Sequence, residues 1–193
     1  EMFLDSASLR SSVVSHAKML GYEVASPRAP IATVNVSLST SNATATMAAG
    51  TTFATKVDGT TYQFVTIDDI TKSNTGISIP FDSVSIYEGT YATTKYLVDS
   101  NDVDQRFMLQ DVRADTSTLT VRVQNSVSDT TTTTYTKATD ITQLSSSSTV
   151  YYLQETESGK FEVYFGDGAT SVALSDGNIV QLNYVITNKT AAN

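Results

Sequence analysis

The stretch of residues 161–188 constrains the fold of this chain more than any other. Apolar side chains alternate with mostly polar ones in two runs, Phe161, Val163 and Phe165 in the first and Val180, Leu182, Tyr184 and Ile186 in the second. A period of two is typical of strands with one buried face. Between the runs, Gly166-Asp167-Gly168 and Asp176-Gly177 predict two bends, because glycine readily adopts positive φ. We therefore expect a hairpin, which needs further strands because a lone hairpin is marginal in water.

Composition limits the classes of protein to which the chain can belong. Its 193 residues suffice for one or two domains with a buried core. It has no cysteine, which excludes disulfides and thiolate metal sites, and its net charge of -8 opposes binding to nucleic-acid phosphates. No apolar run approaches the roughly 20 residues that cross a bilayer. We expect an acidic, β-rich protein that binds neither nucleic acid nor membrane.

One helix is predicted, over residues 5–20. Asp5, Ser6 or Ser8 can cap its start, and Gly21 suits its end. Four apolar residues recur at helical spacing and form one face, which we expect to pack on the local core: Leu9, Val13, Ala17 and Leu20. Val14 and Met19 lie off this face and predict a contact with a partner chain. Packing of the whole helix on the β body is the alternative.

A first set of strands follows the helix. Ile31–Leu38 alternates cleanly, and residues 51–57 and 60–67 flank Asp58-Gly59, the strongest hairpin signal in the chain. Residues 77–86 form another strand candidate. Pro80 predicts that this strand lies at a sheet edge or is interrupted, because proline cannot donate to the ladder.

A second set of strands lies beyond an acidic segment at residues 99–104. That segment lacks the turn glycine and downstream Glu of a calcium loop, so we interpret it as a linker. Residues 119–123 and 150–154 read as strands. The threonine tract at 129–136 is as consistent with an exposed strand as with disorder, because threonine is β-branched.

These patterns predict a mainly β (α+β) chain, with an N-terminal helix followed by two small, mostly antiparallel β domains. We divide it into residues 1–27 (the helix and the proline-marked segment after it), 28–97 (the first β domain) and 98–188 (the second, ending in the Phe-Gly-Asp-Gly hairpin). Residues 189–193 form a short tail after the second domain. Because the chain starts at Glu1 rather than Met, and this last segment adds no element, we expect a fragment of a longer polypeptide.

A search for chemistry finds no catalytic, cofactor-binding or metal-binding set. With one histidine and no cysteine, the usual nucleophile and base pairs cannot be assembled, and His16 is interpreted as structural. Asp167 and Asp176 could in principle act as a glycosidase carboxylate pair. The glycines beside them explain both equally well as turn residues, so we predict no enzymatic activity and no cofactor.

Several short motifs occur in order along most of the chain: His16-Ala17-Lys18, Leu20-Gly21-Tyr22, Pro27-Arg28-Ala29, Gly50-Thr51-Thr52-Phe53, Tyr87-Glu88-Gly89, Tyr164-Phe165-Gly166-Asp167-Gly168 and Asp176-Gly177-Asn178. Together they resemble baseplate J-like proteins, which include the baseplate wedge proteins of contractile-tailed, T-even-like phages. A departure occurs at Ala169-Thr170-Ser171, where relatives often carry another glycine.

The resemblance implies a structural subunit, or a fragment of one, in the phage baseplate wedge. It implies partners as well: further copies of itself, as a dimer within a ring, and other wedge proteins. The implied location is the virion tail baseplate, with assembly in the host cytoplasm. A β-sandwich adhesion or carbohydrate-binding module is the alternative, although the aromatic platform that it needs cannot be located from the sequence.

Overall fold

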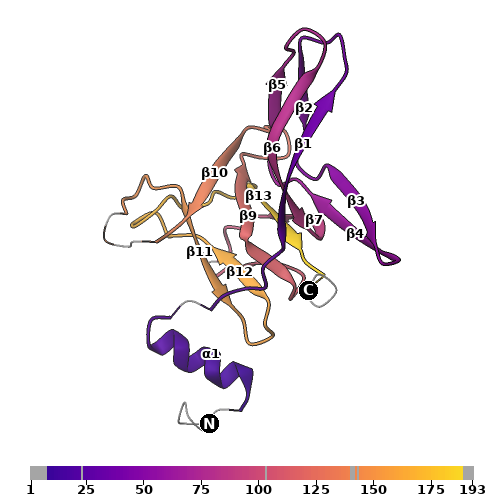
Figure 1. Ribbon diagram of the computed structural model, residues 1–193. Coiled ribbons are helices and arrows are strands. Elements are labelled where there is room, and N and C mark those ends of the chain that lie inside the picture. Colours follow the sequence, from indigo (N-terminus) through magenta and orange to yellow (C-terminus); the bar gives the residue numbers. More distant parts are fainter. Residues whose placement is uncertain (1–7, 23, 103, 140–141, 143, 189–193) are drawn as a thin grey trace. The chain divides into compact units, whose positions relative to one another are not determined.

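The computed structural model describes residues 8–22, 24–102, 104–139, 142 and 144–188 (Figure 1). Strands dominate this part of the chain, one helix precedes them, and nearly all strand pairs are antiparallel. The predicted mainly β class with an N-terminal helix is therefore confirmed. No helix within the described ranges is long and apolar enough to cross a membrane.

The described elements, in chain order, are α1 (Arg10–Met19), β1 (Ile31–Leu38), β2 (Thr44–Met47), β3 (Thr52–Val57), β4 (Thr60–Val65), β5 (Ile70–Ser73), β6 (Ile79–Glu88), β7 (Thr90–Leu97), β8 (Phe107–Met108), β9 (Ala114–Gln124), β10 (Thr132–Lys137), β11 (Val150–Glu155), β12 (Phe161–Tyr164) and β13 (Ile179–Ile186). They form two compact units. The first takes Glu1–Ser26, Thr93–Ala114 and Leu119–Asn183, and the second takes Pro27–Ala92, Asp115–Thr118 and Tyr184–Asn193.

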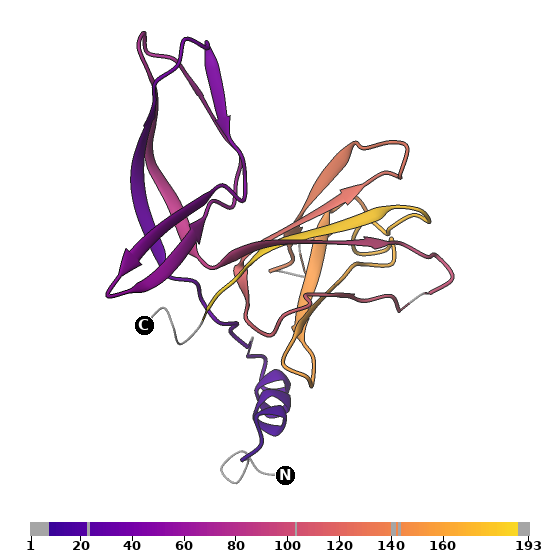
Figure 2. The ribbon, with the colours of Figure 1, turned by 90° about the vertical axis from the view of Figure 1, so that its right-hand side faces the viewer.

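In the second unit, a four-stranded sheet with the order β1-β6-β4-β3 accompanies the two-stranded sheet β2-β5 (Figures 1 and 2). The inward residues of β6 form the centre of its core: Ile79, Phe81, Val84 and Ile86. Apolar residues of β1, β2, β4 and β5 pack against them. The alternation in β1 follows from this arrangement, because only one of its faces meets the core.

The hairpin predicted at Asp58-Gly59 is confirmed by the pairing of β3 with β4. Asp58 has φ 49° and Gly59 has φ 85°, as a two-residue primed turn requires. Pro80 does not interrupt β6. It lies opposite Ser37 of β1, at the end of β6 that β4 does not reach, since β4 pairs only near Tyr87 and Glu88. No ladder bond from the proline nitrogen is needed there.

The seven-stranded sheet has the order β7-β13-β9-β10-β11-β12-β8. Its part in the first unit is built on fully buried apolar residues: Leu109, Val121, Val163, Val180 and Leu182. The threonine tract forms β10, which pairs antiparallel with β9. A short parallel pairing joins β10 to β11, where Thr136 lies opposite Val150.

The predicted hairpin between residues 161–165 and 180–186 is wrong. β12 lies between β11 and β8, whereas β13 lies between β7 and β9. The alternating pattern located both strands but could not choose their neighbours. A short turn lets β12 pair with β11, which precedes it in the chain. Most of β13 is buried, as suits a strand with a neighbour on each side.

The helix is shorter than predicted, and its orientation differs from the expectation. Asp5 and Ser6 lie outside the described residues, and α1 begins at Arg10. Gly21, with φ 80°, ends it as predicted, and the Tyr22 N–H donates to the Ala17 carbonyl oxygen at 2.9 Å.

The apolar face of α1 does not pack on the local core. Leu9 is 62% exposed and Leu20 64% exposed, and Val13 is exposed as well. The expectation for this face was therefore wrong. The side of the helix that carries Arg10 and Val14 instead faces the β11–β12 turn, where Arg10 forms an ion pair with the buried carboxylate of Glu155.

Candidate functional site

The Phe-Gly-Asp-Gly bend begins with a half-buried aromatic side chain in the first unit. The Phe165 ring meets Phe107 edge-on with the centroids 5.6 Å apart, and meets Tyr135 edge-on at 5.2 Å. Tyr96 extends the cluster by an edge contact with Phe107 at 5.7 Å. Edge-to-face packing stabilises such clusters beyond their area burial. Phe165 therefore fixes the start of the bend to the β8 and β10 strands.

Gly166 is required by space rather than by backbone conformation. A Cβ at this position would overlap the hydroxyl oxygen of Ser171 and lie 3.2 Å from the Ser171 Cβ. Ser171 is fully buried, and its hydroxyl has no hydrogen-bond partner within the described residues. The bend therefore closes onto Ser171.

The remaining motif residues hold turns. Gly168 and Gly177 adopt positive φ, at 91° and 78°. The Asp167 carboxylate accepts the Ala169 N–H at 3.0 Å, and the Asp176 carboxylate accepts the Ser100 N–H at 3.0 Å. Both carboxylates thus satisfy backbone donors in turns. In the described ranges, no three acidic or histidine side chains are grouped to hold a metal ion.

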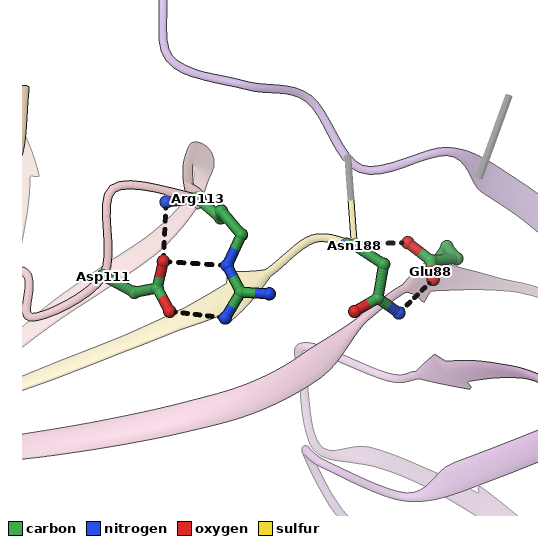
Figure 3. Close-up of polar contacts among 4 residues, drawn as sticks. All are labelled: Glu88, Asp111, Arg113 and Asn188. Atoms are coloured by element: carbon green, nitrogen blue, oxygen red, sulfur yellow. Dashed lines mark hydrogen bonds and ion pairs between the residues drawn. The ribbon is translucent and has the colours of Figure 1, made fainter. Parts of the chain in front are cut away.

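Tyr87-Glu88-Gly89 forms a buried junction in the second unit. The Glu88 carboxylate accepts the Asn188 side-chain N–H at 2.6 Å and the Asn188 backbone N–H at 3.3 Å (Figure 3). The Thr187 hydroxyl donates to it at 3.4 Å. A buried carboxylate is costly unless such donors surround it. The junction therefore fixes the chain just beyond β13 to the end of β6.

Gly89 permits this junction because the two segments come into close contact. A Cβ on Gly89 would overlap the Ile186 carbonyl oxygen and lie 2.9 Å from Val185 Cγ1, and φ is 133°. Sequence reasoning did not assign Glu88 a role. A signal was present, because Glu88 continues the buried alternation of Val84 and Ile86 along β6. An acidic residue in phase with a buried face predicts a carboxylate held by internal donors.

Asp115 provides a second buried carboxylate in the same unit. It accepts the Ala29 N–H at 2.8 Å and both the N–H and hydroxyl of Ser117, at 2.9 and 2.6 Å. Nearby, the Thr118 hydroxyl accepts the Val185 N–H at 2.9 Å. These bonds fix the start of β9 to the chain between Pro27 and Pro30 and to the end of β13.

In two exposed turns, hydrogen bonds lower the pKa of an aspartate, Asp99 in one and Asp129 in the other. The backbone and then the side-chain N–H groups of Asn101 donate to Asp99 and lower its pKa. The side chain of Asn125 and then the backbone N–H of Thr131 lower the pKa of Asp129. The acidic segment at residues 99–104, which we interpreted as a linker, thus begins with a hydrogen-bonded turn. Elsewhere, the Asp111 carboxylate accepts hydrogen bonds from Arg113 and raises the arginine pKa (Figure 3).

A depression of about 680 Å³ lies between α1 and the β11–β12 turn of the first unit. Arg10, Val14 and His16 line it from the helix, and Glu155 and Glu157 line it from the other side. Val14 is half-buried there, whereas Met19 is largely exposed. The two residues predicted to meet a partner therefore have different surroundings.

Together these features define a β-rich structural module in which glycine bends and buried carboxylates hold distant segments together. The chain matches the family described as bacteriophage baseplate wedge protein gp6, third domain, over residues 94–193. This match spans more than half of the chain, which therefore belongs to that family. It is a structural protein of the virion, located in the tail baseplate, and the resemblance seen in the sequence is confirmed. A comparison with curated proteins finds no match.

Proposed function

We propose that the chain acts within the baseplate wedge by protein–protein assembly, with further copies of itself, as a dimer within a ring, and with other wedge proteins. It carries out no catalysis, and it assembles in the host cytoplasm before joining the virion. The motif residues Phe165 to Gly168, Asp176 and Gly177 act architecturally. Membership in the wedge family supports this role, and the exposed apolar face of α1 is the observation that carries it.

The apolar face of α1 supports a contact role because it lies in solvent in the isolated chain. Leu9, Val13 and Leu20 are exposed, and Met19, which lies off this face, is 81% exposed. Apolar side chains grouped in this way mark interaction surfaces. A specific interface needs on the order of 1,000 Å² of buried area. The short helix cannot supply that alone, so surfaces of the strands contribute.

Substitution of Met19 by Glu tests the proposal in the complete gene product. The fold should survive because the side chain lies in solvent, while oligomer formation and incorporation into wedges should fall. Val127→Glu is the matched control, since it places the same charge at an exposed apolar side chain elsewhere in the first unit. Light scattering and co-sedimentation with purified wedge proteins measure both effects. Unchanged assembly of the Met19 variant would reduce the helix to a packing element.

Val14→Glu is the second variant, and it tests the other predicted contact residue. This change places a third carboxylate beside Glu155 and Glu157, so it should also weaken the attachment of the helix to the β11–β12 turn. Circular dichroism and limited proteolysis show whether the helix stays attached. If assembly is lost while the helix stays attached, Val14 contacts a partner. Loss of both assigns it to the local contact.

The adhesion alternative depends on an aromatic platform, for which the stacked pair Tyr152 and Tyr164 is a candidate. The Tyr152 and Tyr164 rings stack with their centroids 5.1 Å apart, and the Arg106 guanidinium lies 4.3 Å from the Tyr164 centroid. Because β12 lies between β11 and β8, Tyr152 and Arg106 approach Tyr164 from opposite sides. Both faces of Tyr164 are covered, which leaves little flat ring surface for a sugar. We therefore retain the assembly role.

A further inference from the structure

The end of the second unit formed by the β1–β2 and β5–β6 loops carries two exposed apolar side chains. We call residues 39–43 and 74–78, with Leu38, the tip. Both loops lie at the same end of their strands (Figures 1 and 2). Ile77 is 88% exposed and Leu38 44% exposed, whereas the inward residues of the adjoining strands are covered. The tip thus places a large apolar side chain in solvent.

Hydrogen bonds hold the two loops of the tip together. The Asn74 side-chain amide donates to the carbonyl oxygens of Thr40 at 2.8 Å and Asn42 at 2.9 Å, and its backbone N–H donates to the Ala43 carbonyl oxygen at 2.9 Å. The Asn74 side-chain oxygen accepts the Gly76 N–H at 2.8 Å. One residue therefore connects both loops and fixes the turn that carries Ile77. A preorganised anchor loses little entropy on binding.

The tip is also free of charge. Residues 31–55 and 73–81 contain no Asp, Glu, Lys or Arg, although 17% of the residues in the whole chain are charged. An apolar centre surrounded by neutral Ser, Thr and Asn side chains resembles the core and rim of protein interfaces, whose centres are depleted of charge. The surface therefore suits a partner that presents an uncharged apolar recess.

We propose that the tip inserts Ile77 into an uncharged apolar recess on a different protein of the baseplate wedge, an inference that rests on the assembly role proposed above. The two depressions described on this chain do not fit, because each carries charged side chains: Arg10, Glu155 and Glu157 in one, and Asp68, Lys72 and Asp82 in the other. An uncharged tip would bury these groups without partners, which is costly. Neither depression therefore suits the tip of a second copy, and the partner to which we assign the recess is a different wedge protein.

Assembly of wedges from the complete gene product and the other purified wedge proteins of the same virus tests this inference. Ile77→Ser should leave folding unchanged, because the side chain lies in solvent, and should weaken incorporation roughly tenfold to a hundredfold. Asn74→Ala should weaken it as well by loosening the tip. The matched control is Val127→Ser, which removes an apolar side chain that is 77% exposed on a loop of the other unit, and it should incorporate normally.

A photo-crosslinking residue at position 77 identifies the recess. The expected product joins position 77 to one cluster of uncharged apolar residues on a different wedge protein. Products with a second copy only, scattered products like those from position 127, or no product would overturn the inference. Wild-type protein that joins no wedge overturns the assembly role and the tip contact together. Normal incorporation of the Ile77 variant alongside wild type overturns the tip contact only.

Discussion

At the scale of single residues, two glycines of the Phe-Gly-Asp-Gly bend serve different physical needs. Gly168 holds a positive φ, which strains a side chain by roughly 1–3 kcal/mol. Gly166 instead leaves room for the buried Ser171 hydroxyl. The sequence alone does not show whether a glycine is required by its positive φ or by a lack of space for a side chain.

Replacement of Gly166 by Val should therefore lower the free energy of unfolding by roughly 2–4 kcal/mol, as expected for overpacking at a buried site. Chemical denaturation of the variant measures the loss. Combining it with Ser171→Gly should restore part of the stability, because that change removes the atoms that Val would meet. Absence of any rescue would show that the strain lies elsewhere in the bend. Asp167→Asn is the matched control and should stay within about 0.5 kcal/mol, since its side-chain oxygen can still accept the Ala169 N–H.

At the scale of elements, β6 contains a local irregularity that the sequence pattern did not indicate. The register of β1 with β6 shifts between Val34 and Val36, opposite Ser83, which has φ 57°. The Ser83 N–H donates to the Asn35 side-chain oxygen at 2.7 Å. A bulge of this kind lets one strand carry an extra residue without turning its buried face outward.

Ser83→Gly should consequently stabilise the protein by roughly 0.5–1 kcal/mol, because relief of the left-handed conformation exceeds the entropic cost of glycine. Ser85→Gly is the matched control on the same strand and should destabilise it by roughly the same amount. Thermal unfolding of both variants provides the comparison. Two changes of the same sign would mean that the bulge relaxes without Ser83 in its left-handed state.

The alternation of side chains predicted most strands well, and it failed where the choice of neighbour mattered. β1 has the predicted bounds, and the Asp58-Gly59 turn lies where its glycine placed it. The pairing of β12 with β11 rather than β13 depends on contacts distant in sequence, which period alone does not encode. The orientation of α1 likewise depends on a contact distant in sequence, since Arg10 pairs with Glu155 of β11 while Leu9, Val13 and Leu20 are exposed.

At the scale of the whole molecule, the buried carboxylates of the second unit join stretches that are far apart in sequence. Glu88 binds the chain after β13, and Asp115 binds the segment before β1. The compact units are consequently discontinuous in sequence, and the chain passes between their residue sets within β7, β9 and β13. Contacts between stretches far apart in sequence, rather than chain order, thus hold the second unit together.

The exposed turns at Asp99 and Asp129 make the stability of the whole chain depend on pH in the acid range. Hydrogen bonds lower the pKa of Asp99 and Asp129 in the folded state below its value in the unfolded chain. In the interval between the two pKa values, the unfolded state binds more protons, so stability rises with pH there. The contribution is complete above the unfolded pKa, near pH 4, and is lost as pH falls through the folded pKa.

The double variant Asp99→Asn, Asp129→Asn should therefore unfold at lower urea concentration than wild type at pH 7, because neutral amides accept these hydrogen bonds less strongly than carboxylates. Below about pH 4 the two curves should converge, since wild type loses its advantage as both carboxylates take up protons. Urea midpoints measured from pH 7 down to pH 2.5 give the comparison. A constant difference between the two proteins across that range would show that the turns stabilise the fold without their charge.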